Sequence, residues 1–293
     1  MTRQIRIVDV FTDRSLAGNQ LAVVLDGKDL SPRLMQRIAR EMNFSETTFV
    51  FPPENAAHAA RIRIFTPALE LPFAGHPTIG TAWVLIDEGV VPKAQNEFVL
   101  EENVGPVPVR ADGAMVWMTH PRLSFGQVVP HKQVAAAIGV EESDVVDDIP
   151  AQIASTGNPF LYVVLRDAEM VDRAVCERPR LEKLLHGGDL AHGVYLFADA
   201  GPNRLYGRMF APDIGEDPAT GSAAGPLGAF AVRYGVAERA AKVALVTEQG
   251  AKMGRPSTLH ISLEYGDSKE IPDRIEVGGG VMPVLRGELE EFS

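Results

Sequence analysis

An internal repeat constrains the fold of this chain more than any other feature of the sequence. Residues 61–85, RIRIFTPALELPFAGHPTIGTAWVL, share one plan with residues 206–232, YGRMFAPDIGEDPATGSAAGPLGAFAV. Each copy opens with a short alternating strand that ends in Phe-x-Pro, passes through a loop to a run of small residues, and ends in an apolar run with helical spacing. A Gly-Asn pair before an apolar strand also recurs, at 18–19 and 157–158. Because two copies are too few for a repeat array, we predict two similar domains that face each other.

Composition limits the class of protein. The chain has 293 residues, of which 45% are hydrophobic and 23% charged, as in a globular protein of two domains. Its net charge of −11 argues against a nucleic-acid partner, which would require a basic patch. No apolar run is long enough for a membrane span, and the first residues, MTRQIRIVDVF, lack the apolar core of a signal peptide. We therefore expect a cytoplasmic protein without a membrane or nucleic-acid partner.

Metal and nucleotide chemistry has no supporting motif. The single cysteine, Cys176, excludes both an internal disulfide and a mechanism that uses two cysteines. No HExxH zinc motif, GxGxxG turn after a strand or GxxxxGK[ST] loop occurs. The context of Ser222, TGSAAG, lacks the first glycine of a GxSxG nucleophile motif. We expect neither a metal nor a cofactor.

The predicted fold is α+β, with strands wrapped around one buried helix in each half. A loop and then a helix are predicted within 75–88, and this helix is apolar on nearly every face, which is typical of a helix enclosed by a sheet. Its counterpart is predicted at 222–234. The remaining predicted elements are strands at 4–11, 21–25, 44–51, 61–65, 160–165, 194–198, 205–210, 242–247, 257–263 and 281–285, a strand pair within 96–118, and helices at 31–42, 134–138 and 179–186.

The predicted halves meet near residue 125. We assign residues 1–125 to an N-terminal half and 126–277 to a C-terminal half, with the active site in the cleft between them. The last strand, within 278–293, is a candidate to return to the N-terminal half. The acidic segment 141–148 is a candidate connection between the halves, although no Gly/Ser-rich linker marks it.

Both runs of small residues lie where a buried helix begins. The first backbone N–H groups of a helix have no partner within the helix, and with the helix dipole they can bind an anion. Gly75, Gly221 and Ser222 leave room for a ligand to approach the backbone. A small carboxylate held between two opposed helix N-termini is one hypothesis. The alternative is that small residues at these positions serve ordinary capping and close packing.

Three side chains near these runs could carry proton chemistry. His76 begins the first buried helix, whose positive end lowers a histidine's pKa and favours the neutral form; the alternative is simple packing at a domain interface. Asp217 precedes Pro218 and could be only a turn residue, with Glu216 beside it in solvent. Glu46 shares a strand face with apolar neighbours. It is therefore either at the wet end of its sheet or partly buried with a raised pKa, as a general base or acid would be.

Five motifs, in this order along the chain, resemble the PhzF family of phenazine-biosynthesis-type isomerases. The match covers the whole chain. It rests on VDVFTDRSLAGNQLAVVL at 8–25, MNFSETTFVF at 42–51, RIFTPALELPFAGHPTIGTA at 63–82, GEDPATGSAAG at 215–225 and EQGAKMGRPS at 248–257. The resemblance implies the diaminopimelate epimerase fold, in which each of two similar halves is a β-barrel around a central helix.

The resemblance also implies cofactor-free acid–base isomerisation in the cleft between the halves. The glutamate of the SET motif, here Glu46, would move a proton on dihydro-hydroxyanthranilate or another small cyclic or unsaturated carboxylic acid. His76 and Asp217 match the other two catalytic positions. The loop positions around the substrate are Gly75, Gly221 and Ser222. Related epimerases use two cysteines, which this sequence lacks at the corresponding positions, and the family suggests a homodimer.

A second hypothesis of a different class remains open. The chain could be a binding or regulatory protein that keeps the fold and binds a small carboxylate without turning it over. Washing of solvent deuterium into a substrate would separate an enzyme from such a binder. A metal or nucleotide enzyme, a third class, is disfavoured because no motif supports it.

Overall fold

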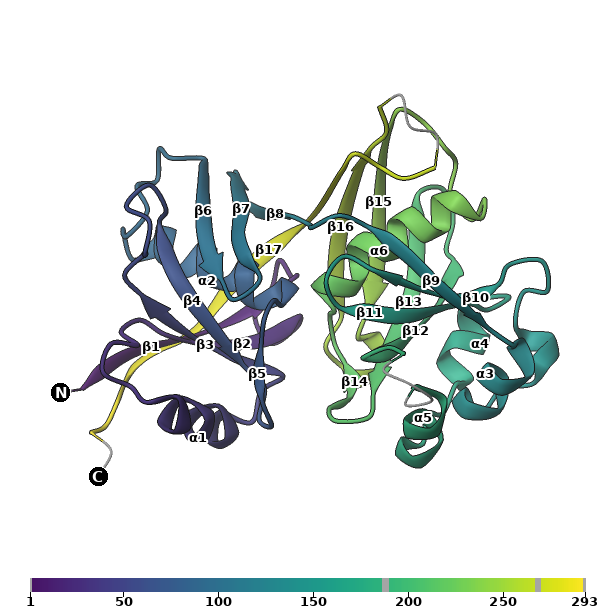
Figure 1. Cartoon of the computed structure of the whole chain (residues 1–293), viewed down its shortest axis with the longest axis horizontal. Coiled ribbons are helices and arrows are strands. Elements are labelled where there is room, and N and C mark those ends of the chain that lie inside the picture. Colours follow the sequence, from purple (N-terminus) through teal and green to yellow (C-terminus); the bar gives the residue numbers. More distant parts are fainter. Residues whose placement is uncertain (1, 186–189, 267–269, 292–293) are drawn as a thin grey trace. The chain divides into compact units, whose positions relative to one another are not determined.

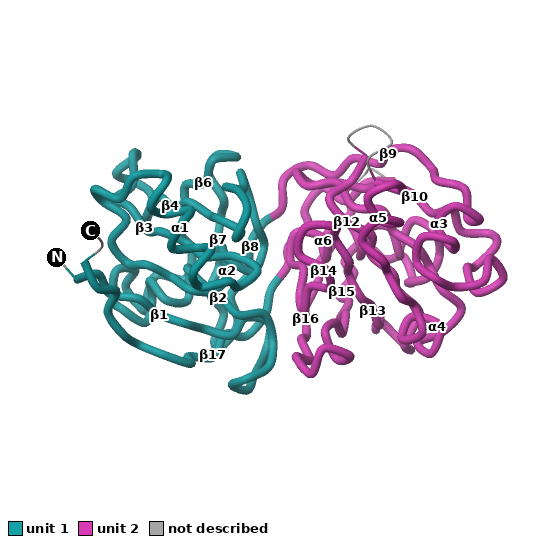
Figure 2. The backbone as a smooth tube through the Cα atoms, turned by 90° about the horizontal axis from the view of Figure 1, so that it is seen from below, with its two compact units in different colours: residues 1–119, 278–293 teal, residues 120–277 magenta. Residues whose placement is uncertain are grey.

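The computed structural model describes residues 2–185, 190–266 and 270–291 and divides into two compact units (Figures 1 and 2). Unit 1 comprises Met1–Thr119 and Gly278–Ser293, and unit 2 comprises His120–Val277. Both units combine strands and helices, so the predicted α+β class is confirmed. The acidic segment 141–148 lies inside unit 2, so it does not connect the two units.

Unit 1 is a closed barrel. Its elements are β1 (Arg3–Val10), β2 (Asn19–Val24), α1 (Pro32–Met42), β3 (Glu46–Phe51), β4 (Ala60–Phe65), β5 (Glu70–Leu71), α2 (Gly75–Asp87), β6 (Glu97–Glu102), β7 (Gly105–Asp112), β8 (Met115–Thr119) and most of β17 (Arg274–Leu289). Strand β2 pairs with β1 and, in parallel, with β3, and β4 pairs with β3 and, in parallel, with β6. Strands β7 and β8 follow, and β17 pairs with both β8 and β1, which closes the sheet on itself.

Helix α2 fills the interior of this barrel. It packs against β1, β2, β3, β7 and β8, and most of its residues are buried. A hydrogen bond of 2.9 Å joins the hydroxyl groups of Thr48 on β3 and Thr81 on α2, so the buried Thr81 hydroxyl has a partner inside the protein. Only Trp83, Ile86 and Asp87 reach partial or full exposure. The expectation of a helix enclosed by a sheet is therefore correct for this unit.

Helix α1 lies on the outside of the barrel, and its amphipathic pattern lets one face pack on the sheet while the other faces solvent. It begins as the sequence predicts, with Pro32 in its first turn and the Ser31 hydroxyl accepting a hydrogen bond from the Leu34 N–H. Its buried face, Met35, Ile38 and Ala39, joins a cluster with the outward-facing apolar side chains of the sheet.

Unit 2 wraps a second sheet around α6. Its elements are β9 (Ser124–Val129), α3 (His131–Ile138), the 3₁₀ turn η1 (Glu142–Asp144), β10 (Ala151–Ser155), β11 (Pro159–Val164), α4 (Ala168–Arg173), α5 (Arg178–Leu185), β12 (Gly193–Asp199), β13 (Arg204–Ala211), β14 (Gly215–Asp217), α6 (Gly221–Arg233), β15 (Lys242–Gln249), the 3₁₀ turn η2 (Ala251–Met253), β16 (Ser257–Glu264) and the start of β17. The strands pair in the order β9, β10, β11, β12, β13, β15, β16, with β14 also on β13.

Helix α6 is buried from Gly221 to Val232 and packs against β10, β11 and β16. Glycines permit this close approach: a Cβ added at Gly228 would lie 2.7 Å from the Ile261 side chain, and one at Gly225 would lie 2.7 Å from His120 Nδ1. Helices α3, α4 and α5 contribute to a separate apolar cluster with β10 to β13, which they cover.

The two units share an order of pairing. In unit 1, β4 binds β5 antiparallel and β6 in parallel; in unit 2, β13 binds β14 antiparallel and β15 in parallel. An ion pair recurs at the same place. Arg63 donates from Nε and Nη2 to Glu70 at 2.7 and 2.6 Å, and Arg208 donates to Glu216 at 2.8 Å from both nitrogens. Glu216 is thus a partly buried partner of Arg208, and the expectation that it lies in solvent is wrong.

Besides the short strand β14 and the two 3₁₀ turns, the sequence did not predict β9, β10 and α4 of unit 2. Strand β9 exposes most of its residues, so it lacks an apolar pattern, and β10 and α4 are too short for a clear period. The helix predicted at 179–186 corresponds to α5, although its last predicted residue, 186, lies outside the described residues. No helix in the part of the chain that the structure describes is long and apolar enough to cross a membrane.

A buried acidic residue, Glu102, ends β6 beside the start of α2. Thr78 of the first turn of α2 donates a hydrogen bond of 2.5 Å to Glu102 Oε1, and the backbone N–H of Ala74 donates to the same carboxyl group. Burial nevertheless dominates and raises the pKa of Glu102 from 4.5 to about 8, while the two hydrogen bonds act in the opposite direction. Glu102 is therefore predominantly protonated at neutral pH.

The Glu102→Gln variant should lose a pH dependence of stability. Between pH 4.5 and 8 the folded wild type holds a proton that the unfolded chain releases, so its free energy of unfolding falls by up to about 1.4 kcal/mol per pH unit as the pH rises. The amide cannot titrate. Urea unfolding at pH 5 and pH 7.5 should show the variant gaining roughly 2–3 kcal/mol on the wild type over this interval. A difference between the two proteins that stays constant with pH would contradict the assignment.

Candidate active site

Unit 1 brings a carboxylate and an imidazole together. Glu46 is the first residue of β3, and His76 lies in the first turn of α2, directly after Gly75. Because α2 packs against β3, the two side chains meet, with His76 Nε2 3.4 Å from Glu46 Oε2. The His76 side chain is 4% exposed and that of Glu46 13% exposed. The three residues predicted for this half of the site therefore form one local group.

His76 is held as a neutral imidazole. Burial lowers its pKa from 6.5 to about 3, and a hydrogen bond with the backbone of Gln20 opposes this only in part. Asn19 places its side-chain nitrogen 3.3 Å from His76 Nδ1, so the ring is oriented from β2 as well as from α2. The neutral form agrees with the sequence-based expectation, but the main cause is burial. A neutral ring can accept or donate a proton, as acid–base catalysis requires.

Glu46 combines the two environments considered for it, the end of a sheet and a partly buried position. Its side chain is mostly covered, yet it stands at the first position of its strand, where the sheet ends. The next two residues, Thr47 and Thr48, are fully buried. A carboxylate so placed can reach a ligand at the end of the barrel while its neighbours exclude water from one side.

Unit 2 brings the other three predicted residues together. Asp217 ends β14 and is 4% exposed, and Gly221 and Ser222 open α6 four residues later. The Thr220 hydroxyl donates a hydrogen bond of 2.6 Å to Asp217 Oδ2. Asp217 is thus a buried carboxyl with a fixed partner at the start of a buried helix.

Several polar residues around these groups were not singled out from the sequence. In unit 2, Gln249 hydrogen-bonds the Asp217 loop, and His120 bonds Thr156 Oγ1 at 2.8 Å and the backbone of Gly221. Burial lowers the pKa of His120 to about 3, so it too is neutral. The only sequence signal was the position of Gln249 inside the EQG motif; nothing local marks His120.

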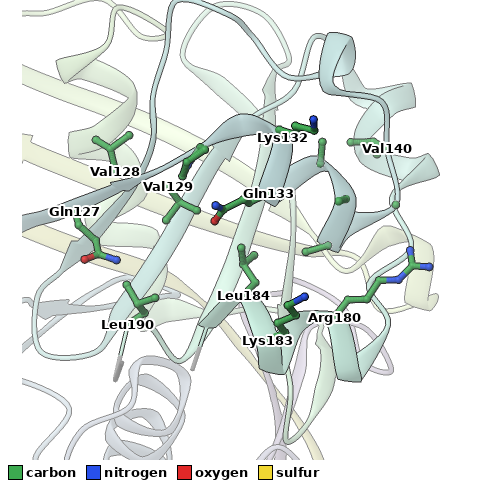
Figure 3. A pocket seen from close by; sticks show the side chains of 15 residues that line it. Gln127, Val128, Val129, Lys132, Gln133, Val140, Arg180, Lys183, Leu184 and Leu190 are labelled. Atoms are coloured by element: carbon green, nitrogen blue, oxygen red, sulfur yellow. The ribbon is translucent and has the colours of Figure 1, made fainter. Parts of the chain in front are cut away.

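A separate cavity lies on the outer part of unit 2, with a volume of about 1040 Å³. It is formed by β9, α3 and α5, and Figure 3 shows Lys132, Arg180 and Lys183 around it with Val128, Leu184 and Leu190. None of the predicted site residues lines it. Among the described residues, no group of three or more His, Cys, Asp or Glu side chains could hold a metal ion.

Known proteins match this chain along nearly its whole length. The family model of phenazine biosynthesis-like protein, PhzC-PhzF, matches residues 8–287. The trans-2,3-dihydro-3-hydroxyanthranilate isomerase of Pseudomonas fluorescens is 37% identical, covering 97% of this chain and 98% of its own. An uncharacterized isomerase of Mesorhizobium japonicum is also 37% identical, over 98% and 99% of the two chains.

A solved structure agrees with these matches. The phenazine biosynthesis protein of the PhzF family from Bacillus anthracis superimposes with a TM-score of 0.89 at 25% identity, covering 99% of this chain and 100% of its own. The names of the relatives confirm the prediction of an isomerase. Sequence and structure together show that the chain belongs to the PhzF family of phenazine biosynthesis-like proteins.

Proposed function

We propose that this protein is a cofactor-independent isomerase that moves a proton within a small cyclic or unsaturated carboxylic acid. The observation that carries the proposal is the pair of Glu46 and His76, with a carboxylate oxygen 3.4 Å from an imidazole held neutral by burial. Such a pair can exchange a proton with a substrate and keep it from bulk water.

In the proposed reaction, the Glu46 carboxylate removes a proton from a carbon atom of the substrate. The electron pair of the broken C–H bond moves into the conjugated system, and Glu46 returns the proton to another carbon. No net oxidation or reduction occurs, so the reaction requires no redox partner. Backbone N–H groups at the helix starts near Gly75 and Gly221 would stabilise the negative charge of the substrate carboxylate and of the intermediate.

We also infer that the units are similar halves of a duplicated fold and contribute to one active site. The shared order of strand pairing and the recurring Arg–Glu pairs support the duplication. Asp217, Gly221 and Ser222 of unit 2 would then complete the site begun by Glu46, Gly75 and His76, with the substrate in a cleft between the halves. Chemistry divided between two homologous halves would explain why each unit alone holds only part of the acid–base machinery.

The relative from Pseudomonas fluorescens supplies the first candidate substrate. That protein is named for trans-2,3-dihydro-3-hydroxyanthranilate, which is a cyclic, unsaturated amino acid with one carboxylate. At 37% identity over nearly the full length, this compound or one of the same class is the substrate that we propose.

Turnover in D₂O tests the proposed chemistry. Wild-type protein should convert trans-2,3-dihydro-3-hydroxyanthranilate and place deuterium on the product carbon, as followed by NMR and absorbance. Glu46→Gln should reduce kcat by at least 10²-fold, because general acid–base groups contribute about that much. Glu97→Gln, the same change at an exposed position of unit 1, is the matched control and should retain full activity.

The outcomes separate the hypotheses. Full activity of Glu46→Gln would refute its role as proton carrier. The wild type could instead fail to convert this compound and a wider set of small cyclic carboxylates. If these compounds nevertheless raise the Tm of the protein, the chain is a binding protein rather than an isomerase.

The charge state of His76 can be measured directly. Because its pKa is about 3, the ring should stay neutral between pH 5 and pH 8, and its imidazole ¹³C and ¹H shifts should remain constant over that range. The signal is assigned by its loss in His76→Gln. A titration with a midpoint between pH 5 and 8 would show that the ring is more accessible to water than in this structure.

A further inference from the structure

Gln249, the last residue of β15, is hydrogen-bonded to the loop that carries Asp217. Its Oε1 accepts from the Tyr195 hydroxyl at 2.9 Å and from the Thr220 N–H at 3.2 Å. Its Nε2 donates to the Asp217 carbonyl oxygen at 2.7 Å and lies 3.0 Å from Thr220 Oγ1. Gln249 is fully buried, so these bonds are not in competition with water.

The contacts of Gln249 leave no ambiguity in the direction of its hydrogen bonds. A backbone N–H can only donate and a backbone carbonyl can only accept, so Oε1 must face Thr220 N and Nε2 must face Asp217 O. The second hydrogen of Nε2 then points to Thr220 Oγ1, which leaves the hydroxyl hydrogen of Thr220 for Asp217 Oδ2 at 2.6 Å. Gln249 thereby fixes the Thr220 hydroxyl as a donor to the Asp217 carboxyl group.

Unit 1 has a similar arrangement at the end of the strand that corresponds to β15. Glu102 is the last residue of β6, as Gln249 is of β15, and each strand runs parallel to the strand that leads into the loop. Glu102 accepts from the N–H of Ala74, the residue before α2, as Gln249 accepts from the N–H of Thr220, the residue before α6. The Thr78 hydroxyl lies 2.5 Å from Glu102 Oε1 and 2.6 Å from the Ala74 carbonyl oxygen.

We propose that Glu102 and Gln249 are paired positioning residues, each of which holds the N-terminal turn of a buried helix so that His76 and Asp217 are presented to the substrate. Neither residue needs to touch the substrate. This inference rests on the proposed function, because it assigns a purpose to His76 and Asp217 in one reaction.

The two members of the pair differ in what they must supply. Glu102 accepts from the Ala74 N–H, and its protonated carboxyl group can share a hydrogen with the Thr78 hydroxyl; the side-chain amide of glutamine offers the same acceptor and a donor. Gln249 must also donate two, to Asp217 O and Thr220 Oγ1, and a carboxyl group cannot do so. The substitution Glu102→Gln should therefore be tolerated in unit 1, whereas Gln249→Glu should be harmful in unit 2.

Reciprocal variants test this asymmetry. Glu102→Leu, which removes both carboxyl oxygens, should lower kcat by on the order of 10²-fold, whereas Glu102→Gln should retain most of the rate. Gln249→Glu should lower kcat by on the order of 10²-fold with a smaller change in KM, since a misplaced catalytic group costs about that much. Thr220→Val should behave like Gln249→Glu, whereas Thr220→Ser, which keeps the hydroxyl, should restore most of the rate.

Hydrogen–deuterium exchange supplies a readout that does not depend on turnover. Peptides that cover residues 217–225 should exchange faster in Gln249→Glu than in the wild type, and peptides that cover 72–80 should be unchanged in Glu102→Gln. Unchanged exchange in Gln249→Glu would overturn the proposal that Gln249 holds the start of α6, whatever the activity. Faster exchange with an unaltered kcat would overturn its role in positioning, and the proposed isomerisation would stand. If the wild type converts no substrate but the exchange pattern is as expected, the proposed function fails, and Gln249 still holds the start of α6.

Discussion

The structure depends on how the protein satisfies the start of a helix that it buries on almost every side. Helices α2 and α6 are enclosed by sheet, so their first N–H groups cannot rely on water. Some of these groups bind side chains from the end of a neighbouring strand, Glu102 in one unit and Gln249 in the other. The same turns carry His76 and Ser222. Enclosing the helix thus places reactive side chains and a positive helix end at one location.

The starts of the two buried helices resemble each other in backbone arrangement but carry different side chains. At the start of α2 a carboxylate faces an imidazole, whereas at the start of α6 an aspartate is tied to Thr220. Burial keeps both His76 and His120 neutral, so neither ring adds a positive charge near these helix starts.

Much of the fold could be predicted from the sequence, because its strongest signals are local. The apolar run after His76 and its repeat after Ser222 identified both buried helices, and the Ser31-Pro32 pair located the start of α1. Strand β9 escaped prediction because most of its residues are exposed. The roles of Gln249 and His120 depend on contacts with residues far away in the sequence, which no spacing rule reveals. The candidate site residues therefore lie in motifs that the sequence marks, whereas the residues that hydrogen-bond them in the structure do not.

The path of β17 also bears on how the protein is made. Unit 2 is continuous in sequence, whereas the barrel of unit 1 is closed only by β17, which pairs with β1 and β8. On the ribosome, the first unit to emerge therefore waits with two open sheet edges while the second unit is synthesised and can fold. Exposed edges invite pairing with other chains. The nascent chain is most vulnerable to aggregation through its N-terminal part, and release of the last strand ends that period.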